Sequence, residues 1–252
     1  MNPLAKIAER IRLRTVSPLA RSVVRDRLTY LPAAKLRCIE QALAETGAID
    51  GDILEFGVAL GGSGILLARA ALPSRRFIGF DVFGTIPPPT SEKDDEKSRR
   101  RFATIASGRS GGIGGDLYYG YREDLLGDVV RAFARHGVPV DGECVMLHKG
   151  LFEETWPLER VGTIAFAHID CDWYDPVSYC LSARADRLHP DGIIAIDDYH
   201  DYGGCHAAVD EFLASHPDFA FDDGPNPFIR RRRDGAGAQD ASSAPTSRAS
   251  RL

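Results

Sequence analysis

The sequence lacks any apolar run long enough to cross a membrane, and this absence argues against a membrane-spanning protein. A membrane-spanning helix needs about 18–20 consecutive apolar residues, and no window of the 252-residue sequence provides them. The first 30 residues are dotted with Lys, Arg, Glu and Asp, so they also lack the apolar stretch of a secretory signal peptide. We therefore expect a cytoplasmic protein that has no membrane partner.

Cysteine is scarce, and its spacing excludes two classes of small-domain scaffold. The five cysteines form an odd, scattered set without any Cys-x-x-Cys pair. They are Cys38, Cys144, Cys171, Cys180 and Cys205. A disulfide framework needs an even set, and a cysteine-rich zinc site needs close pairs. Neither kind of scaffold fits this chain.

The sequence also lacks an excess of positive charge. Its formal net charge is -5, whereas nucleic-acid-binding proteins usually concentrate basic residues on one face. The one basic run, Arg230 to Arg233, has two readings. It is either a phosphate or nucleic-acid patch or, as we favour, a solvated edge strand that leads into a loose tail. We expect no nucleic-acid partner.

From Asp52 onward, short apolar segments alternate with helical patterns. The apolar segments are 52–56, 76–81, 143–148, 162–170 and 191–197. The helical stretches between or after them are about 63–72, 123–136, 175–188 and 204–215. Continuous apolar strands that alternate with helices form a parallel sheet with both faces covered, so the pattern predicts an α/β fold. A last pair of segments, 218–222 and 227–231, flanks a turn and predicts an antiparallel edge hairpin.

The remaining segments complete the predicted organisation. Residues 1–50 are predicted to be a helical extension with Leu36, Ile39 and Leu43 on one apolar stripe, and 51–233 form the main domain. Within it, 82–122 holds three prolines, a charged run and a glycine cluster, and is too long for an ordinary loop. We interpret this insertion as a lid with a helix near 95–106, the alternative being a floppy excursion. Residues 234–252 are predicted to be disordered.

A glycine-rich turn follows the first strand and opens a helix. Glycines in such a turn let the backbone approach a ligand, and the helix start offers unpaired N–H groups. A P-loop would need a lysine before Ser63, and a dinucleotide fingerprint would need a glycine in place of Ala59. The looser acid-x-Gly turn of methyltransferases remains, with Glu55 placed to meet the methionine ammonium group of S-adenosylmethionine. The predicted cofactor-binding residues of this turn are Glu55, Gly57, Gly61, Gly62 and Ser63.

Asp81 ends the next predicted strand. In a doubly wound sheet that strand end lies beside the first, where an acid can accept hydrogen bonds from both ribose hydroxyls of a nucleotide. Dinucleotide enzymes use the same geometry, and a solvated Asp in a tight turn is the structural alternative. We interpret Asp81 as a ribose ligand because it reinforces Glu55 at the neighbouring strand end.

Three acids are predicted to meet at the ends of two later strands. Asp170 closes one strand, and Asp197 and Asp198 close the next. Neighbouring parallel strands lie about 4.8 Å apart, so these carboxylates share one sheet edge and need a cation. All-oxygen ligation selects a hard metal, which favours Mg²⁺ over Ca²⁺ or Mn²⁺. Of the nearby polar residues, His168 is predicted to be a core histidine and Asp175 the N-cap of the following helix.

Together these motifs resemble the macrocin O-methyltransferase family. The matching residues are Glu55-x-Gly57 with Gly61-Gly62-Ser63, Asp81-x-Phe83-x-x-Ile86-Pro87, His168-Ile169-Asp170-x-Asp172-x-Tyr174, and Asp197-Asp198-Tyr199 with Cys205 and Ala208-Val209-Asp210. They cover roughly residues 35 to 216 in the same order. The resemblance implies a Rossmann-like class I methyltransferase with a mostly parallel seven-stranded sheet. It also implies a homo-oligomer and a sugar acceptor, either an antibiotic deoxysugar or its nucleotide-linked precursor.

The resemblance further implies the chemistry of the site. Mg²⁺ would be held by Asp170, Asp197 and Asp198. For methyl transfer from S-adenosylmethionine we predict that Asp170, or a hydroxide that it positions, acts as the general base. Two alternatives stay open at this point. One is a catechol-type O-methyltransferase acting on aromatic diols, and the other is a nucleotide- or metabolite-binding module that has lost catalysis.

Overall fold

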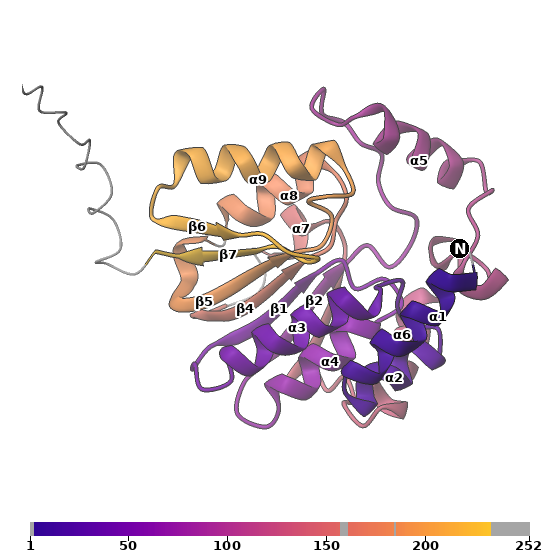
Figure 1. Ribbon diagram of the computed structural model, residues 1–252, viewed down its shortest axis with the longest axis horizontal. Coiled ribbons are helices and arrows are strands. Elements are labelled where there is room, and N and C mark those ends of the chain that lie inside the picture. Colours follow the sequence, from indigo (N-terminus) through magenta and orange to yellow (C-terminus); the bar gives the residue numbers. More distant parts are fainter. Residues whose placement is uncertain (1–2, 157–160, 184, 233–252) are drawn as a thin grey trace, which may run out of the picture.

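A seven-stranded sheet organises the computed structural model, which describes residues 3–156, 161–183 and 185–232 (Figure 1). The strands follow the order β3-β2-β1-β4-β5-β7-β6. Their bounds are β1 Asp52–Phe56, β2 Phe77–Asp81, β3 Val145–Lys149, β4 Ile164–Ile169, β5 Leu188–Ile196, β6 Phe219–Asp222 and β7 Phe228–Arg231. The first five strands pair in parallel, and β7 is antiparallel to both β5 and β6. The predicted parallel sheet with an antiparallel edge hairpin is confirmed.

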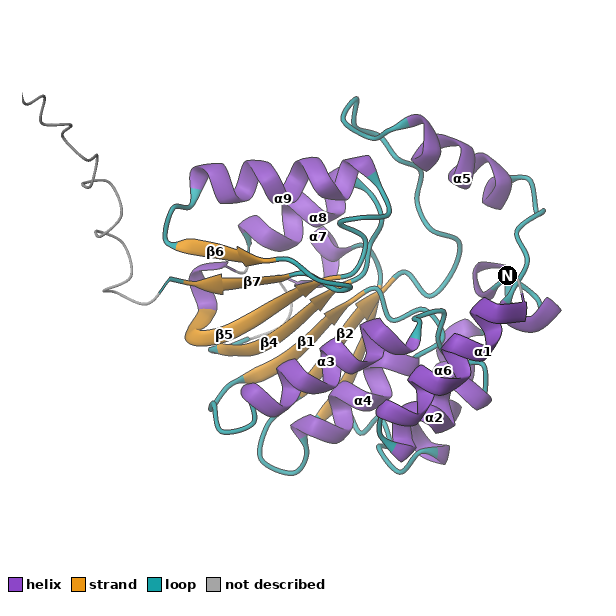
Figure 2. Cartoon of the chain, in the orientation of Figure 1, coloured by secondary structure: helices purple, strands orange, loops and turns teal. Residues whose placement is uncertain are grey.

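Helices cover both faces of the sheet, as Figures 1 and 2 show. One face carries α1 Pro3–Arg12, α2 Pro18–Arg25, α3 Ala33–Glu45, α4 Gly62–Ala71 and α6 Leu125–Arg135, and the other carries α7 Phe152–Thr155, α8 Tyr174–Ser182 and α9 Gly203–Ser215. Successive strand residues point to opposite faces, so Ile53 joins one apolar core and Leu54 the other. Burial on both faces explains why the strands are continuously apolar. No helix in the described part of the chain is long and apolar enough to cross a membrane.

The N-terminal extension packs directly on the glycine-rich turn. The predicted stripe Leu36, Ile39 and Leu43 is buried in the same core as α4 and α6. Ahead of that stripe, the Leu28 carbonyl accepts the N–H of Gly62, the first residue of α4, at 2.9 Å. The extension therefore forms part of the wall at the carboxyl edge of the sheet.

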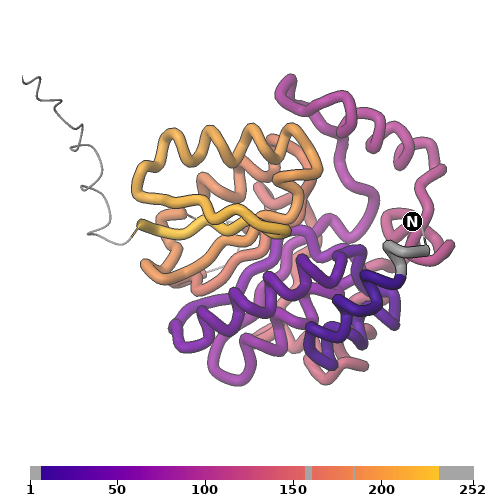
Figure 3. The backbone as a smooth tube through the Cα atoms, viewed as in Figure 1, coloured from indigo at the N-terminus to yellow at the C-terminus, as the bar shows by residue number. Residues whose placement is uncertain are grey.

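The 82–122 insertion leaves the sheet after β2 and returns before α6, carrying α5 Glu96–Ala106 as its one α-helix among the described residues (Figure 3). Its first half is fixed on the N-terminal ends of two helices. Asp94 accepts the N–H of Tyr174 at 2.9 Å, and Asp95 accepts the N–H of Gly203 at 3.0 Å. The Thr85 hydroxyl, near the start of the insertion, donates to the Gly120 carbonyl, near its end, at 2.9 Å. These hydrogen bonds anchor the insertion as an arch, and the helix predicted near 95–106 is present in it as α5.

Two local predictions around α8 are wrong. The helix begins at Tyr174 rather than after Asp175, and it ends at Ser182 because β5 already starts at Leu188. Asp175 does not cap it, since the carboxylate accepts the Thr90 hydroxyl at 2.5 Å and the N–H of Tyr174 is satisfied by Asp94. The predicted tail, 234–252, lies outside the described residues.

Candidate active site

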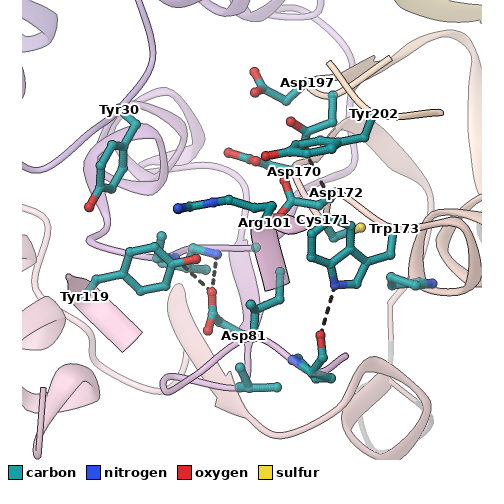
Figure 4. Close-up of a pocket in the computed structure, with 18 of the residues that line it drawn as sticks. Tyr30, Asp81, Arg101, Tyr119, Asp170, Cys171, Asp172, Trp173, Asp197 and Tyr202 are labelled. Carbon is teal, nitrogen blue, oxygen red and sulfur yellow. Dashed lines mark hydrogen bonds between the residues drawn. The ribbon is translucent and has the colours of Figure 1, made fainter. Parts of the chain in front are cut away.

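A cavity of about 920 Å³ opens at the carboxyl ends of the parallel strands. Small-molecule sites usually enclose about 300–1,000 Å³, so this volume lies near the upper end of that range. Its wall combines the 28–35 segment, the turn after β1, the insertion, and the loops after β3, β4 and β5. Figure 4 shows Asp81 on one side, Asp170, Asp172 and Asp197 on the other, and Arg101 between them.

Gly57 joins the two sides of the cavity. Its φ is +96°, and a Cβ atom at this position would lie only 1.8 Å from the carbonyl oxygen of Asp170. The Asp170 N–H in turn donates to the Phe56 carbonyl at 2.8 Å, which keeps β1 and β4 paired up to the cavity. Only glycine permits this contact. The predicted cofactor turn and the predicted general base are consequently adjacent.

Gly61 and Gly62 shape the turn from the side away from the cavity. Gly61 has φ +89°, and a Cβ atom there would lie 2.9 Å from a ring carbon of Phe133. The Gly62 N–H is already taken by the Leu28 carbonyl, so it is not available to a ligand. Ser63 lines the cavity, and the two glycines do not. Their packing role explains why the turn needs glycine there.

Asp81 fixes the backbone of the turn as well as lining the cavity. Its Oδ2 accepts the N–H groups of Val58 and Ala59, both at 2.8 Å, and its Oδ1 accepts that of Phe83 at 2.6 Å. Ala59 and Phe83 have φ values of +47° and +44°, a region that residues with a side chain seldom adopt. Burial raises the pKa of Asp81, and the three N–H donors oppose that rise. The carboxylate therefore holds two strained residues at the cavity wall.

Glu55 lies beneath the turn in a buried chain of charged groups. Its side chain is 0% exposed, and Oε1 lies 3.1 Å from Nδ1 of His168. Nε2 of the same ring lies 3.9 Å from Oδ1 of Asp197. Burial lowers the pKa of His168, but the two carboxylates outweigh it and raise the pKa to about 10. His168 is thus an imidazolium held between two acids, and Glu55 does not line the cavity.

Four carboxylates, here called the acid cluster, gather where β4 and β5 end. They are Asp170, Asp172, Asp197 and Asp198, and all four line the cavity. One ligand atom each of Asp170, Asp197 and His168 lie within 4.8 Å of one another. Asp198 accepts the N–H of Asp172 at 3.2 Å, and Asp172 has a left-handed φ of +34°. All three predicted metal ligands and Asp172 thus line one cavity, but the group within 4.8 Å contains His168 and not Asp198.

The members of the acid cluster differ in their electrostatic surroundings. Removal from water raises the pKa values of Asp170 and Asp198 well above the ordinary value, and the neighbouring carboxylates raise them further. For Asp197, burial also acts to raise the pKa, but His168 and Lys35 outweigh it and the net shift is downward. Asp197 is therefore the member whose charge is compensated by the protein.

Lysine and arginine side chains at the cavity were not identified from the sequence. Lys35 of α3 donates to the carbonyl and Oδ2 of Asp197, at 2.8 and 2.9 Å, and to Oδ2 of Asp201 at 3.0 Å. Arg101 of α5 donates to the Ser110 hydroxyl at 2.9 Å and lies over the Tyr118 ring, 5.4 Å from its centre. Helical spacing within 95–106 would have placed Arg101 on a common face with Lys97, which also lines the cavity.

The family model of the macrocin O-methyltransferases, described as Macrocin-O-methyltransferase (TylF), matches residues 15–109 and 123–217. The two matched segments lie on either side of the 110–122 segment of the insertion. They contain every residue predicted from the sequence to bind cofactor or metal.

The individual relatives described next are each less than 30% identical to this chain. An 8-demethyl-8-(2,3-dimethoxy-alpha-L-rhamnosyl)-tetracenomycin-C 4'-O-methyltransferase from Streptomyces olivaceus is 28% identical over 187 residues, which span 69% of this chain and 65% of that protein, slightly less than two thirds of its length. The O-methyltransferase NovP matches with a TM-score of 0.66 and 23% identity over 81% of this chain and 82% of its own. CalS11, a TDP-rhamnose 3'-O-methyltransferase of calicheamicin biosynthesis, matches with a TM-score of 0.54 and 21% identity over 93% and 97% of the two chains. At these identities the structural matches show a shared fold.

Proposed function

Because this chain belongs to the macrocin O-methyltransferase family, a family of S-adenosylmethionine-dependent enzymes, we propose that it methylates a sugar hydroxyl in antibiotic biosynthesis. The observation that carries the proposal is the cavity, which places the glycine-rich turn and Asp81 opposite the acid cluster. The first side suits a nucleoside cofactor and the second a polar acceptor. In keeping with the family, we further propose that the enzyme is a homo-oligomer.

The cofactor is proposed to lie along the turn after β1. Three of the four lone pairs of the Asp81 carboxylate accept backbone N–H groups, so the remaining one, on Oδ1, would accept a hydrogen bond from a ribose hydroxyl. Gly57 and Ser63 would contact the cofactor directly, since both line the cavity. Glu55, Gly61 and Gly62 are proposed to act from behind the wall by fixing the shape and charge of the turn. Bound S-adenosylmethionine supplies an electrophilic methyl group through its sulfonium.

Replacing Asp81 by Ala should weaken binding of S-adenosylhomocysteine in the absence of metal. The loss should be about 1.5–3 kcal/mol, the usual contribution of hydrogen bonds to a charged group, or roughly 10- to 150-fold in Kd. Isothermal titration calorimetry measures it directly. Unchanged affinity in Asp81→Ala would contradict the ribose assignment.

Asp141→Ala is the matched control for this variant. Asp141 also accepts three backbone N–H groups, from Glu143, Cys144 and Val145 at 2.9, 2.8 and 2.9 Å, but it does not line the cavity. Loss of its bonds should destabilise a local turn and leave cofactor affinity unchanged. The difference between the two variants therefore isolates the ligand contact.

The acid cluster fits a hard divalent cation. Oδ1 of Asp197 is buried and has no hydrogen-bond partner, although the neighbouring Oδ2 is bonded to Lys35. This oxygen, together with the carboxylate oxygens of Asp170 and Asp198, would form the all-oxygen set of ligands that Mg²⁺ prefers. His168 contributes an atom to the same group, but Mg²⁺ prefers oxygen ligands to an imidazole nitrogen. We propose that Asp170, Asp197 and Asp198 hold Mg²⁺.

Methyl transfer requires an ionised, correctly directed acceptor hydroxyl. Bound Mg²⁺ would supply a Lewis acid that orients neighbouring sugar oxygens and lowers the pKa of the reacting hydroxyl. Asp170 would take the proton from that hydroxyl, because it is the acid of the cluster that lies against Gly57 and thus against the cofactor turn. The rest of the wall aligns the two substrates and excludes water. We propose that the insertion contributes to this exclusion as a lid, since Lys97 and Arg101 of α5 line the cavity.

A panel of acceptors tests the function. With S-adenosylmethionine and Mg²⁺, the enzyme should give mass increments of one methyl group on deoxysugars, and the panel should include both TDP-deoxysugars and finished deoxysugar glycosides. The tetracenomycin 4'-O-methyltransferase is named for a finished glycoside and CalS11 for TDP-rhamnose, which are these two acceptor types. Methylation of catechols alone would favour the aromatic-diol alternative. Cofactor binding without any methylated product would favour a non-catalytic module.

A further inference from the structure

Lys35 connects the N-terminal extension to the acid cluster, at a sequence separation of 162 residues from Asp197. Its ammonium group donates to three oxygens, two of Asp197 and one of Asp201. An ammonium group has three N–H donors, so none is left for a substrate or a proton transfer. Lys35 therefore touches the site without being available for its chemistry.

We propose that Lys35 is a positioning residue that clamps one oxygen of Asp197 so that the other is held ready for the metal. The inference rests on the proposed metal site and assigns a new residue to it. Oδ2 of Asp197 is bonded to Lys35 at 2.9 Å, whereas Oδ1 is buried without a hydrogen bond, 3.9 Å from Nε2 of His168. The simultaneous bond from Nζ to the Asp197 carbonyl, at 2.8 Å, fixes the side chain relative to its own backbone. The carboxylate is thereby restrained in one rotamer, in which a ligand atom of Asp197 lies within 4.8 Å of one of Asp170.

The burial of this pair distinguishes it from an ordinary surface salt bridge. The side chains of Lys35 and Asp197 are 13% and 7% exposed. Exposed ion pairs contribute little, but removing one partner of a buried pair leaves a charge without compensation. Asp197 would then be free to turn toward Nε2 of His168, now 3.9 Å from Oδ1. Lys35 opposes that movement because it holds the other oxygen, Oδ2, at 2.9 Å.

The clamp also holds the loop that carries the acids. Asp201 lies in the loop between β5 and α9, accepts Lys35 through its side chain and accepts Lys97 of α5 through its carbonyl. One lysine from the extension and one from the insertion thus meet on a single residue of this loop. A bound cation in a site of this kind depends on such supporting contacts, whose loss typically costs about 10- to 100-fold in metal affinity.

The proposal is tested by titrating the protein with Mn²⁺ and measuring the free ion through its electron paramagnetic resonance signal. Lys35→Met removes the donors and keeps the length of the side chain, and it should weaken Mn²⁺ binding about 10- to 100-fold. Lys35→Arg keeps the charge and the donors and should restore most of the affinity. Affinity for S-adenosylhomocysteine, measured without metal, should be the same in all variants because Lys35 acts on the acid side of the cavity.

Lys93→Met is the matched control. Lys93 also holds an acid and a hydroxyl, Glu211 at 2.6 Å and Tyr174 at 2.8 Å, but it lies at the surface and does not line the cavity. It should leave Mn²⁺ affinity unchanged. If Lys35→Met does not fold, Lys35→Gln keeps a donor without the charge and should show the same loss in a smaller degree.

The outcomes separate this inference from the function on which it rests. Wild-type or tighter Mn²⁺ binding by folded Lys35→Met or Lys35→Gln would overturn the clamp, because the lysine would then only compete with the metal. Equal loss in Lys35→Met and Lys35→Arg would also contradict it. If the wild-type protein itself binds no Mn²⁺, the proposed metal site fails and the clamp fails with it.

Discussion

Asp170→Asn should lower kcat by at least about 10²-fold at saturating Mg²⁺, which is the usual effect of losing a general base. Asn keeps the size of the side chain and one oxygen ligand, but its amide cannot take up the proton of the acceptor hydroxyl. The N–H of residue 170 and its carbonyl against Gly57 are unaltered, so the turn after β1 keeps its shape. Affinity for S-adenosylhomocysteine should therefore stay nearly unchanged, and a selective loss of kcat is the measurable signature.

Three comparison variants show what this result means. Asp218→Asn removes an exposed partner of Arg231 far from the cavity wall and should leave kcat unaltered. Asp198→Ala and Asp197→Ala should instead raise the Mg²⁺ concentration needed for activity. A wild-type kcat in Asp170→Asn would overturn the assignment of the base, and a defect cured by more Mg²⁺ would reduce Asp170 to a metal ligand.

The fold was predictable because its signals are local. Each parallel strand is a short apolar run, and each is followed by a residue that the sheet edge places in the site, as Asp81 and Asp170 show. The glycine turn was recognised for the same reason, although only Gly57 and Ser63 of its five predicted ligands line the cavity. Gly61 and Gly62 were required by packing against Phe133 and Leu28, which a motif cannot distinguish from ligand approach.

The errors and omissions have the opposite cause, since they depend on partners distant in sequence. Asp175 followed by Pro176 is a good local N-cap signal, yet the N–H of Tyr174 is satisfied by Asp94, 80 residues earlier. Lys35 reads as one polar residue beside an apolar stripe, and only the folded chain shows its contact with Asp197. Ala59 illustrates the same limit, because its left-handed backbone is held by the carboxylate of Asp81 in place of the glycine that a motif would require.

Removal of the divalent cation should abolish methylation, and restoring Mg²⁺ should recover it fully. The acid cluster brings four carboxylates together, of which Asp197 alone is paired with a lysine among the described residues. Without a cation, nothing would hold two sugar oxygens against Asp170 or offset the charge that develops on the reacting hydroxyl. Activity after treatment with EDTA should fall to background in a mass-based assay, while S-adenosylhomocysteine still binds on the other side of the cavity.

Stability measured in parallel decides whether the metal is catalytic or structural. A cation at ten times its Kd stabilises the folded state by about 1.4 kcal/mol, which for a chain of this size corresponds to a few degrees in Tm. A catalytic Mg²⁺ should therefore shift Tm by no more than that when it is removed. A metal that holds the fold would on removal lower Tm and cofactor affinity together. The sheet argues for the first outcome, since backbone pairing joins β4 and β5 up to Ile169 and Ile196, and the Asp197 N–H donates to the Ile169 carbonyl at 2.9 Å. Full activity in EDTA would exclude a metal-assisted mechanism and leave the fold and the cofactor side of the cavity as they are.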